Sequence, residues 1–193
     1  MTCWWWVRHG PTHAKGMVGW TDMPADLSDD AALKRLNAHL PDQALVVSSD
    51  LSRAVATADR LATPGRDRLA HTPAIRELNF GDWEGREFAE IAKSDPDISR
   101  AYWSDPGDTA APGGESWNET AGRVAGFVAD INASHQGRDI IAVAHFGVIL
   151  TQLQAAGRLS ARSALSFKID NLSVTRLEFL DPGWHIHGVN QLP

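Results

Sequence analysis

The sequence is poor in cysteine, in long apolar runs and in net positive charge. Cys3 is the only cysteine among 193 residues, which excludes an intrachain disulfide, and its apolar surroundings predict burial rather than reactivity. No apolar run is long enough to cross a membrane, and the N-terminus lacks the basic segment of a signal peptide. A formal net charge of −6 argues against a nucleic-acid-binding surface. We therefore expect a cytoplasmic protein with neither a nucleic-acid nor a membrane partner.

The composition itself is that of an ordinary globular protein. Hydrophobic residues make up 43% of the chain and charged residues 22%, which predicts a folded chain rather than a disordered one. A single domain over residues 1–193 is the simplest expectation, because the sequence shows no repeat, low-complexity tract or linker. The acidic net charge leaves room for a small anionic ligand, since a local cluster of arginine and histidine can be positive inside an acidic protein.

Short apolar runs alternate with amphipathic segments along most of the chain. Strands are expected at 4–7, 44–49, 69–72 and 139–144, with a terminal hairpin at 173–180 and 184–189. Helices are expected between Ser28 and Pro41, from an N-cap at Asp50 to residue 62, at 87–94 and 97–104, from a capping box at Ser116 and Glu119 to before Gly137, and at 148–156 and 160–165. This alternation predicts an α/β fold, a three-layer sandwich with a mostly parallel central sheet and helices on both faces.

Basic side chains stand where three of the predicted strands end. Arg8 and His9 follow the first strand, whose residues are Trp4-Trp5-Trp6-Val7. Arg53 falls in the first turn of the helix after the second strand, and His145 follows strand 139–144. The carboxyl ends of parallel strands share one edge of a sheet, so these side chains are expected to converge in one crevice. A guanidinium group is suited to binding a phosphate, and an imidazole beside it is suited to attacking the phosphorus.

Each of these residues, taken alone, also has an ordinary structural explanation. His9 fits a turn, Arg53 fits the surface of an amphipathic helix, and His145 fits the core after a buried strand. A metal site built from His9, His13 and His145 is a further alternative. It is disfavoured because the spacing is not that of a compact ligand set and because Arg8 would repel the cation. Convergence of all three strand ends is what favours a phosphate site.

A carboxyl group that could serve this chemistry is expected in the acidic loop 77–84. Glu77 and Glu84 both lie in this loop, and the spacing of residues alone leaves the choice between them open.

Five motifs, taken together, resemble the histidine phosphatase superfamily, also called phosphoglycerate-mutase-like. They are Arg8-His9-Gly10-Pro11-Thr12, Ser49–Ala58 with Arg53 inside it, Glu77–Gly85, Pro112–Ser116 and Ala144–Gly147. They occur in the family's order from residue 4 to about 150, so the resemblance covers the core of the chain.

The resemblance implies a role for each matching residue. His9 is expected to be the nucleophile that becomes a phosphohistidine, and Glu77, favoured over Glu84 by the motif alignment, the general acid. The substrate-binding residues are expected to be Arg8, Thr12, Arg53, His145 and Phe146, of which Arg8, Arg53 and His145 also belong to the catalytic set. The family pattern implies neither a metal nor another cofactor.

Two departures from the family pattern affect the substrate contacts. Phe146 stands where the family often has glycine, which predicts a narrower pocket mouth. The segment 19–28 is two residues longer than usual in the family, so its substrate contacts are expected to depart from the family pattern. Trp20, Trp83, Trp103 and Trp117 could ring the pocket and face a flat base, although packing is the commoner use of tryptophan.

The resemblance implies a phosphomonoester hydrolase acting on a small phosphorylated metabolite, with α-ribazole 5′-phosphate as a candidate substrate. One alternative is a cofactor-dependent phosphoglycerate mutase, which is disfavoured because only about 35 residues separate Glu77 from Pro112. The other alternative is a non-catalytic phosphate-binding module, whose mark would be loss of the nucleophile or the acid.

Overall fold

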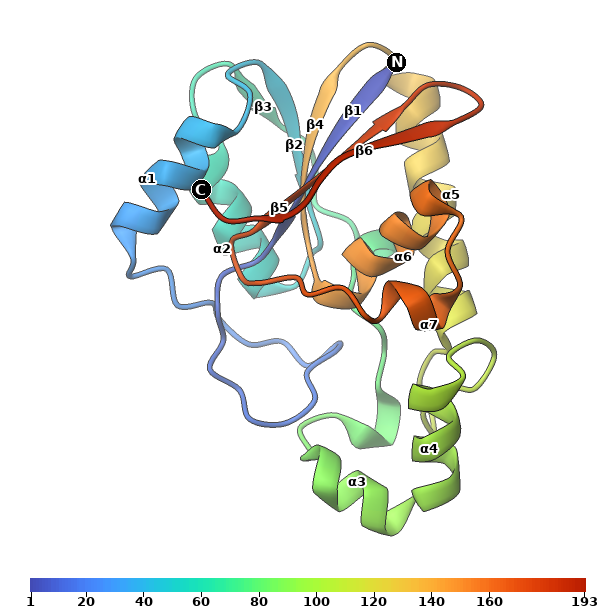
Figure 1. Cartoon of the computed structure of the whole chain (residues 1–193). Coiled ribbons are helices and arrows are strands. Elements are labelled where there is room, and N and C mark those ends of the chain that lie inside the picture. The colour runs from blue at the N-terminus through green and yellow to red at the C-terminus, as the bar shows by residue number, and fades with distance from the viewer.

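A six-stranded sheet forms the middle layer of the protein in the computed structural model, which describes residues 1–193 (Figure 1). The strands are β1 (Thr2–Arg8), β2 (Ala44–Ser48), β3 (Arg66–Arg68), β4 (Asp139–Ala144), β5 (Val174–Phe179) and β6 (Trp184–Gln191). Their order is β3-β2-β4-β1-β5-β6; β1 to β4 pair in parallel, and β5 pairs antiparallel with both of its neighbours. The expected α/β fold with a mostly parallel sheet is confirmed.

Helices cover both faces of this sheet. They are α1 (Asp30–His39), α2 (Ser52–Leu61), α3 (Phe88–Ser94), α4 (Pro96–Ser104), α5 (Trp117–Ser134), α6 (Phe146–Gly157) and α7 (Ala161–Ala164). Figure 1 shows α1 and α2 on one face, α5 and α6 on the other, and α3 and α4 projecting beyond the end of the sheet. No helix combines the length and the apolar character that a membrane crossing requires.

The alternation of side chains along β1 explains why the sheet is covered on both sides. Trp4 and Trp6 belong to the core cluster that contains the buried residues of α5 and α6, whereas Trp5 and Val7 belong to the cluster formed with α1 and α2. A strand that is apolar on both faces fits the middle of a sandwich, and β1 lies between β4 and β5. The same strand therefore holds Arg8 and His9 at a rigid, buried edge.

Two local expectations were wrong. The third strand is Arg66–Arg68 rather than 69–72, where only an isolated bridge joins Thr72 to Ser49. Asp50 is not the N-cap of α2: Leu51 occupies that position and has no side-chain cap. The Asp50 carboxylate instead pairs with the Arg76 guanidinium at 2.6 and 2.7 Å, a partner that lies 26 residues away and outcompetes the local cap.

We expect the core to depend strongly on Trp4. Its indole is fully buried, stacks on Trp6 with ring centroids 5.0 Å apart, and donates from Nε1 to Asn132 Oδ1 at 2.9 Å. Trp4→Ala should lower the free energy of unfolding by about 3–5 kcal/mol, because it opens a large cavity. Urea unfolding followed by circular dichroism measures this, with Trp103→Ala, at a 36%-exposed tryptophan, as the size-matched control. Equal losses in the two variants would contradict this account of the core.

Candidate active site

The carboxyl ends of β1, β2 and β4 bring the predicted basic residues to one edge of the sheet. Arg8 ends β1, His9 follows it, and His145 follows β4 as the N-cap of α6. Arg53 lies in the first turn of α2, directly after β2. The strand order β2-β4-β1 makes these three ends neighbours, and the rings of His9 and His145 lie with their centroids 5.0 Å apart.

The imidazole of His9 is buried and held in one tautomer. Its Nδ1 lies 2.6 Å from the carbonyl oxygen of Gly10, and because a carbonyl can only accept, Nδ1 carries the proton and Nε2 keeps a free lone pair. Burial is the main cause that lowers the pKa of His9 to about 3, and the charges of Arg53 and Arg8 act in the same direction. His9 is therefore neutral at physiological pH and can act as a nucleophile.

Four polar atoms at this edge are buried without a hydrogen-bond partner. They are Nε of Arg8, both ring nitrogens of His145 and Oγ of Ser173, whose carbonyl oxygen accepts from the Arg8 backbone N–H. An unpartnered buried polar group costs about 1–3 kcal/mol, so a native fold keeps several together mainly where a ligand satisfies them. Burial also lowers the pKa of His145 well below its ordinary value. The arrangement is suited to an anion with several oxygen atoms, such as a phosphate group.

The Glu77 carboxyl group lies in the same cleft as Arg8. Its oxygens accept from the backbone N–H groups of Leu78 and Gly147 at 3.0–3.1 Å. A side chain at position 147 would not fit, because an added Cβ would lie 2.6 Å from Glu77 Oε1 and 2.1 Å from Leu78 Cδ1. Burial raises the pKa of Glu77 and outweighs these hydrogen bonds and the nearby arginines, which lower it. The geometry and the raised pKa fit a carboxylic acid that donates a proton.

Glu84, the alternative acid, has a different environment. Its carboxylate accepts from the backbone N–H groups of Gly19, Trp20, Thr21 and Phe80 at 2.7–3.2 Å. Burial alone would raise the pKa of Glu84, but the hydrogen bonds from Thr21, Gly19 and Trp20 outweigh it and hold the pKa below its usual value. Glu84 therefore stays ionised and binds the backbone of the loop 19–21.

That loop in turn holds Arg53. The guanidinium group of Arg53 donates to the carbonyl oxygens of Thr21 and Gly19 at 2.8 and 2.6 Å, and the side chain is buried. The N–H groups of the loop thus bind Glu84 while its carbonyl groups bind Arg53. Glu84 acts at a distance, by positioning an arginine of the site.

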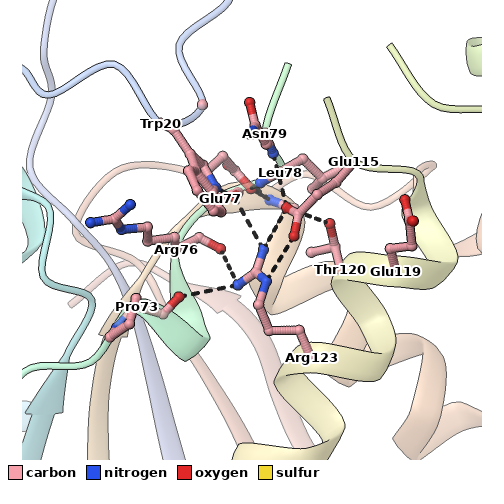
Figure 2. Close-up of polar contacts among 12 residues, drawn as sticks. Trp20, Pro73, Arg76, Glu77, Leu78, Asn79, Glu115, Glu119, Thr120 and Arg123 are labelled. Atoms are coloured by element: carbon pink, nitrogen blue, oxygen red, sulfur yellow. Dashed lines mark hydrogen bonds and ion pairs between the residues drawn. The ribbon is translucent and has the colours of Figure 1, made fainter. Parts of the chain in front are cut away.

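Arg123 of α5 holds the backbone that carries Glu77 (Figure 2). Its guanidinium group forms a two-pronged ion pair with Glu115 at 2.8 and 3.0 Å. It also donates to the carbonyl oxygens of Ala74 and Arg76 at 2.9 and 3.0 Å, and more weakly to that of Glu77 at 3.4 Å. One arginine thereby fixes the backbone of the segment that leads to Glu77.

Trp20 supports the same backbone as Arg123. Its indole Nε1 donates to the carbonyl oxygen of Glu77 at 2.8 Å, and its ring lies under the guanidinium of Arg76, 4.8 Å from the ring centroid.

Arg123 was not singled out from the sequence, and no motif spacing marks it. Asn171 was also missed, although its side-chain amide donates to the carbonyl oxygen of His9 at 2.7 Å.

A cleft of about 560 Å³ opens over Arg8 and Glu77. Most of its wall is apolar or aromatic, formed by Met17, Val18, Phe80, Phe88, Trp103, Phe146 and Leu165. Of the four tryptophans considered in the sequence, Trp103 lines this cleft, whereas Trp83 and Trp117 are buried.

The two remaining predicted substrate contacts differ in position. Phe146 lines the cleft with the Arg8 guanidinium 5.6 Å from its ring centroid, as expected for a residue at the pocket mouth. Thr12 is half-buried in the loop after β1, and none of the hydrogen bonds of the site includes its side chain. The alternative metal site is not assembled, because His13 is exposed and its Nε2 lies 2.8 Å from Asp26.

Comparisons with known proteins agree with this geometry. The model of the histidine phosphatase superfamily (branch 1) matches residues 4–192. The adenosylcobalamin/alpha-ribazole phosphatase of Salmonella typhimurium strain LT2 is 29% identical over 174 residues, covering 86% of this chain and 85% of the relative. The metal-independent phosphoserine phosphatase of Arabidopsis thaliana is 32% identical over 149 residues, covering 73% of this chain and 58% of the relative.

Solved structures show the same likeness. Bacillus stearothermophilus YhfR has a TM-score of 0.89 and 25% identity, covering 100% of this chain and 98% of its own. A mycobacterial glucosyl-3-phosphoglycerate phosphatase solved with VO3 has a TM-score of 0.85 and 29% identity, covering 98% of each chain. The chain belongs to the histidine phosphatase superfamily. The expected class, a phosphatase of small phosphorylated metabolites, is confirmed at the level of this family.

We expect Glu77 and Glu84 to be separable by the leaving group of the substrate. Glu77→Gln should slow the hydrolysis of an alkyl phosphate by about 100-fold or more, because general acid catalysis contributes about 10²–10⁴-fold. Hydrolysis of p-nitrophenyl phosphate should slow far less, because its leaving group needs little protonation. The acid must be protonated, so kcat/KM on the alkyl phosphate should fall as pH rises through the raised pKa of Glu77.

The matched control is Glu84→Gln, which should show no dependence on the leaving group. Steady-state kinetics with both substrates across pH measures each effect. The reverse pattern would transfer the acid role to Glu84.

Proposed function

We propose that this chain, acting as one domain over residues 1–193, hydrolyses a phosphomonoester through a phosphohistidine. The observation that supports this most directly is a neutral imidazole and a buried carboxyl group, whose pKa burial raises, at one edge that also carries two arginines. In the first step His9 Nε2 attacks the phosphorus, the ester P–O bond breaks, and Glu77 gives its proton to the leaving oxygen. In the second step the Glu77 carboxylate takes a proton from water, whose oxygen attacks the phosphorus; the P–N bond breaks and inorganic phosphate leaves.

Charge stabilisation would come from side chains of the protein. Arg8 and Arg53 keep their positive charge although burial lowers their pKa values, because a guanidinium group does not lose its proton at neutral pH. With the single N–H group that the neutral imidazole of His145 carries, they would bind the equatorial oxygens as negative charge is redistributed in the transition state. The alternative of a non-catalytic phosphate-binding module is disfavoured because His9 and Glu77 are both present in the same site.

The nucleophile can be tested by trapping the intermediate. His9→Ala should abolish phosphate release and should form no acid-labile phosphoprotein after brief incubation with a ³²P-labelled ester, because no other imidazole of the site has its geometry. His13→Ala, which removes an exposed histidine four residues away, should keep both. Near-normal turnover by a folded His9→Ala protein would overturn the covalent mechanism.

We propose further that the leaving alcohol carries a flat apolar ring system, with α-ribazole 5′-phosphate as the candidate substrate. Beyond the phosphate-binding edge the cleft wall is aromatic and aliphatic, and Arg8 is the only cation among its lining residues. Phe88 and Trp103, 57% and 36% exposed, lie against each other at this wall with ring centroids 5.6 Å apart. A sugar acid would find no second cation there for its carboxylate, whereas an aromatic base could stack. The alpha-ribazole phosphatase among the relatives supports the same choice.

The substrate class predicts a selective effect of Trp103. On α-ribazole 5′-phosphate, Trp103→Ala should lower kcat/KM by about tenfold, the scale of one lost stacking contact. On p-nitrophenyl phosphate, whose small ring reaches less of the wall, the loss should be smaller. Phosphate release is the readout, and Ile98→Ala, at an exposed apolar residue of α4 outside the cleft wall, is the control.

The mutase alternative is tested on the same enzyme. Incubation with 3-phosphoglycerate and catalytic 2,3-bisphosphoglycerate should give little or no 2-phosphoglycerate, because the short α3–α4 segment does not seal a phosphoenzyme from water. Isomerisation faster than phosphate release on every substrate would favour the mutase alternative over the phosphatase.

A cytoplasmic location stays a prediction from the sequence.

A further inference from the structure

A second group of ligand-bearing side chains lies on the β5–β6 hairpin. It consists of Glu178 on β5 and His185 and His187 on β6, whose carboxylate oxygen and ring nitrogens all lie within 4.8 Å of one another. Both histidines are exposed and Glu178 is half-buried, so an ion from solvent can reach all three. No step proposed above uses these residues.

Strand pairing brings the three side chains together. Glu178 is the direct cross-strand partner of His185, and neighbours of this kind have Cβ atoms about 4.5–5.5 Å apart. The register then shifts: Leu177 pairs with Ile186 but Arg176 pairs with Gly188, which leaves His187 as an extra residue on β6. Bulges of this kind re-aim a side chain. The His187 Nε2 atom accordingly lies 2.8 Å from Glu178 Oε2.

This group is far from the phosphate-binding edge. Glu178 pairs with Cys3 of β1, five residues before Arg8, which corresponds to about 17 Å along the strand. Figure 1 shows the turn between β5 and β6 at the end of the sheet that carries the N-terminus, opposite the end where α3 and α4 project.

We propose that Glu178, His185 and His187 form a zinc-binding site. Two imidazoles and one carboxylate suit Zn²⁺, whereas Mg²⁺ and Ca²⁺ prefer oxygen ligands alone. Tetrahedral bonds of about 2.0–2.1 Å place ligand atoms about 3.3 Å apart, so the exposed imidazoles need only small rotations to close on the ion. Solvent water would fill the fourth position.

The residues around the site limit its affinity for zinc and indicate what a bound ion would do to the sheet. Arg176 is the cation nearest along β5, but its guanidinium group is held over the Trp5 ring at 4.5 Å and donates to Cys3 Sγ at 3.3 Å. Its charge makes the site weaker than a closed four-ligand zinc site. An ion held by residues of both strands would link β6, the last strand of the sheet, to β5 and would stabilise the hairpin.

Metal titration of the full chain tests the site directly. After removal of bound metal with a chelator, isothermal titration with Zn²⁺ should show one binding event that the double variant His185→Ala/His187→Ala lacks. Each single variant should bind at least about tenfold more weakly, because even loss of a group that only supports a ligand costs about 10–100-fold. Mg²⁺ should give no comparable binding. Zinc should also raise the Tm of the natural chain more than that of the double variant.

The matched control is His13→Ala, which removes the other exposed histidine–carboxylate pair, His13 with Asp26 at 2.8 Å, where no second histidine stands. It should keep the zinc-binding event. Circular dichroism checks that the double variant is folded, and Glu178→Gln provides a ligand loss that keeps the size of the side chain. Zinc binding by the folded double variant with unchanged stoichiometry and affinity, or no binding by the natural chain, would overturn the proposal.

Discussion

Burial of an imidazole and a carboxyl group at the same sheet edge is the constraint on which the site depends. Removing His9 and Glu77 from water disfavours the charged form of each, so the pKa of the histidine falls while that of the glutamate rises. His9 is then neutral near pH 7 and keeps a free lone pair, and Glu77 holds its proton to a higher pH than an exposed glutamate does. The nearby arginines cannot respond in this way and remain charged. In the proposed mechanism, desolvation therefore prepares the nucleophile and the acid, and the arginines beside them supply the positive charge that binds the phosphate.

The buried groups need a frame that keeps them in place, and most of that frame is backbone bound by side chains. The Glu84 carboxylate accepts hydrogen bonds from the N–H groups of the loop 19–21, and the carbonyl groups of that loop accept from Arg53. Arg123, paired with Glu115, binds the carbonyl groups that precede Glu77. In both cases a charged side chain is fully occupied by partners within the protein. These residues can tune the site without touching a substrate.

The two ends of the sheet differ in chemistry. The carboxyl ends of the parallel strands carry the arginines, the neutral histidines and the aromatic cleft. At the opposite end, the antiparallel hairpin carries exposed histidines beside a carboxylate. Antiparallel pairing places residues from two strands directly opposite each other, whereas the crossover connections of the parallel strands gather loops at one edge. The topology thus separates two kinds of site in one small protein.

The sequence alone was enough to predict the fold class and the sheet edge at which the structure gathers the candidate site residues. Apolar runs such as Trp4–Val7 determine buried strands through local periodicity, and the residues that follow them lie at one edge once the sheet is parallel. Local signals were weaker where a distant partner competes, as at Asp50, which binds Arg76 instead of capping α2. The short strand β3 also begins earlier in the chain than the apolar pattern predicted.

Only the tertiary structure decided what each charged group does. Glu77 and Glu84 are seven residues apart in one loop, yet one is desolvated against Gly147 and the other is surrounded by N–H donors from 19–21. Arg123 and Asn171 bear no motif, because their partners lie about 46 and 162 positions away in the chain. A pKa depends on the groups that surround an atom in space, and those groups come together only when the chain has folded.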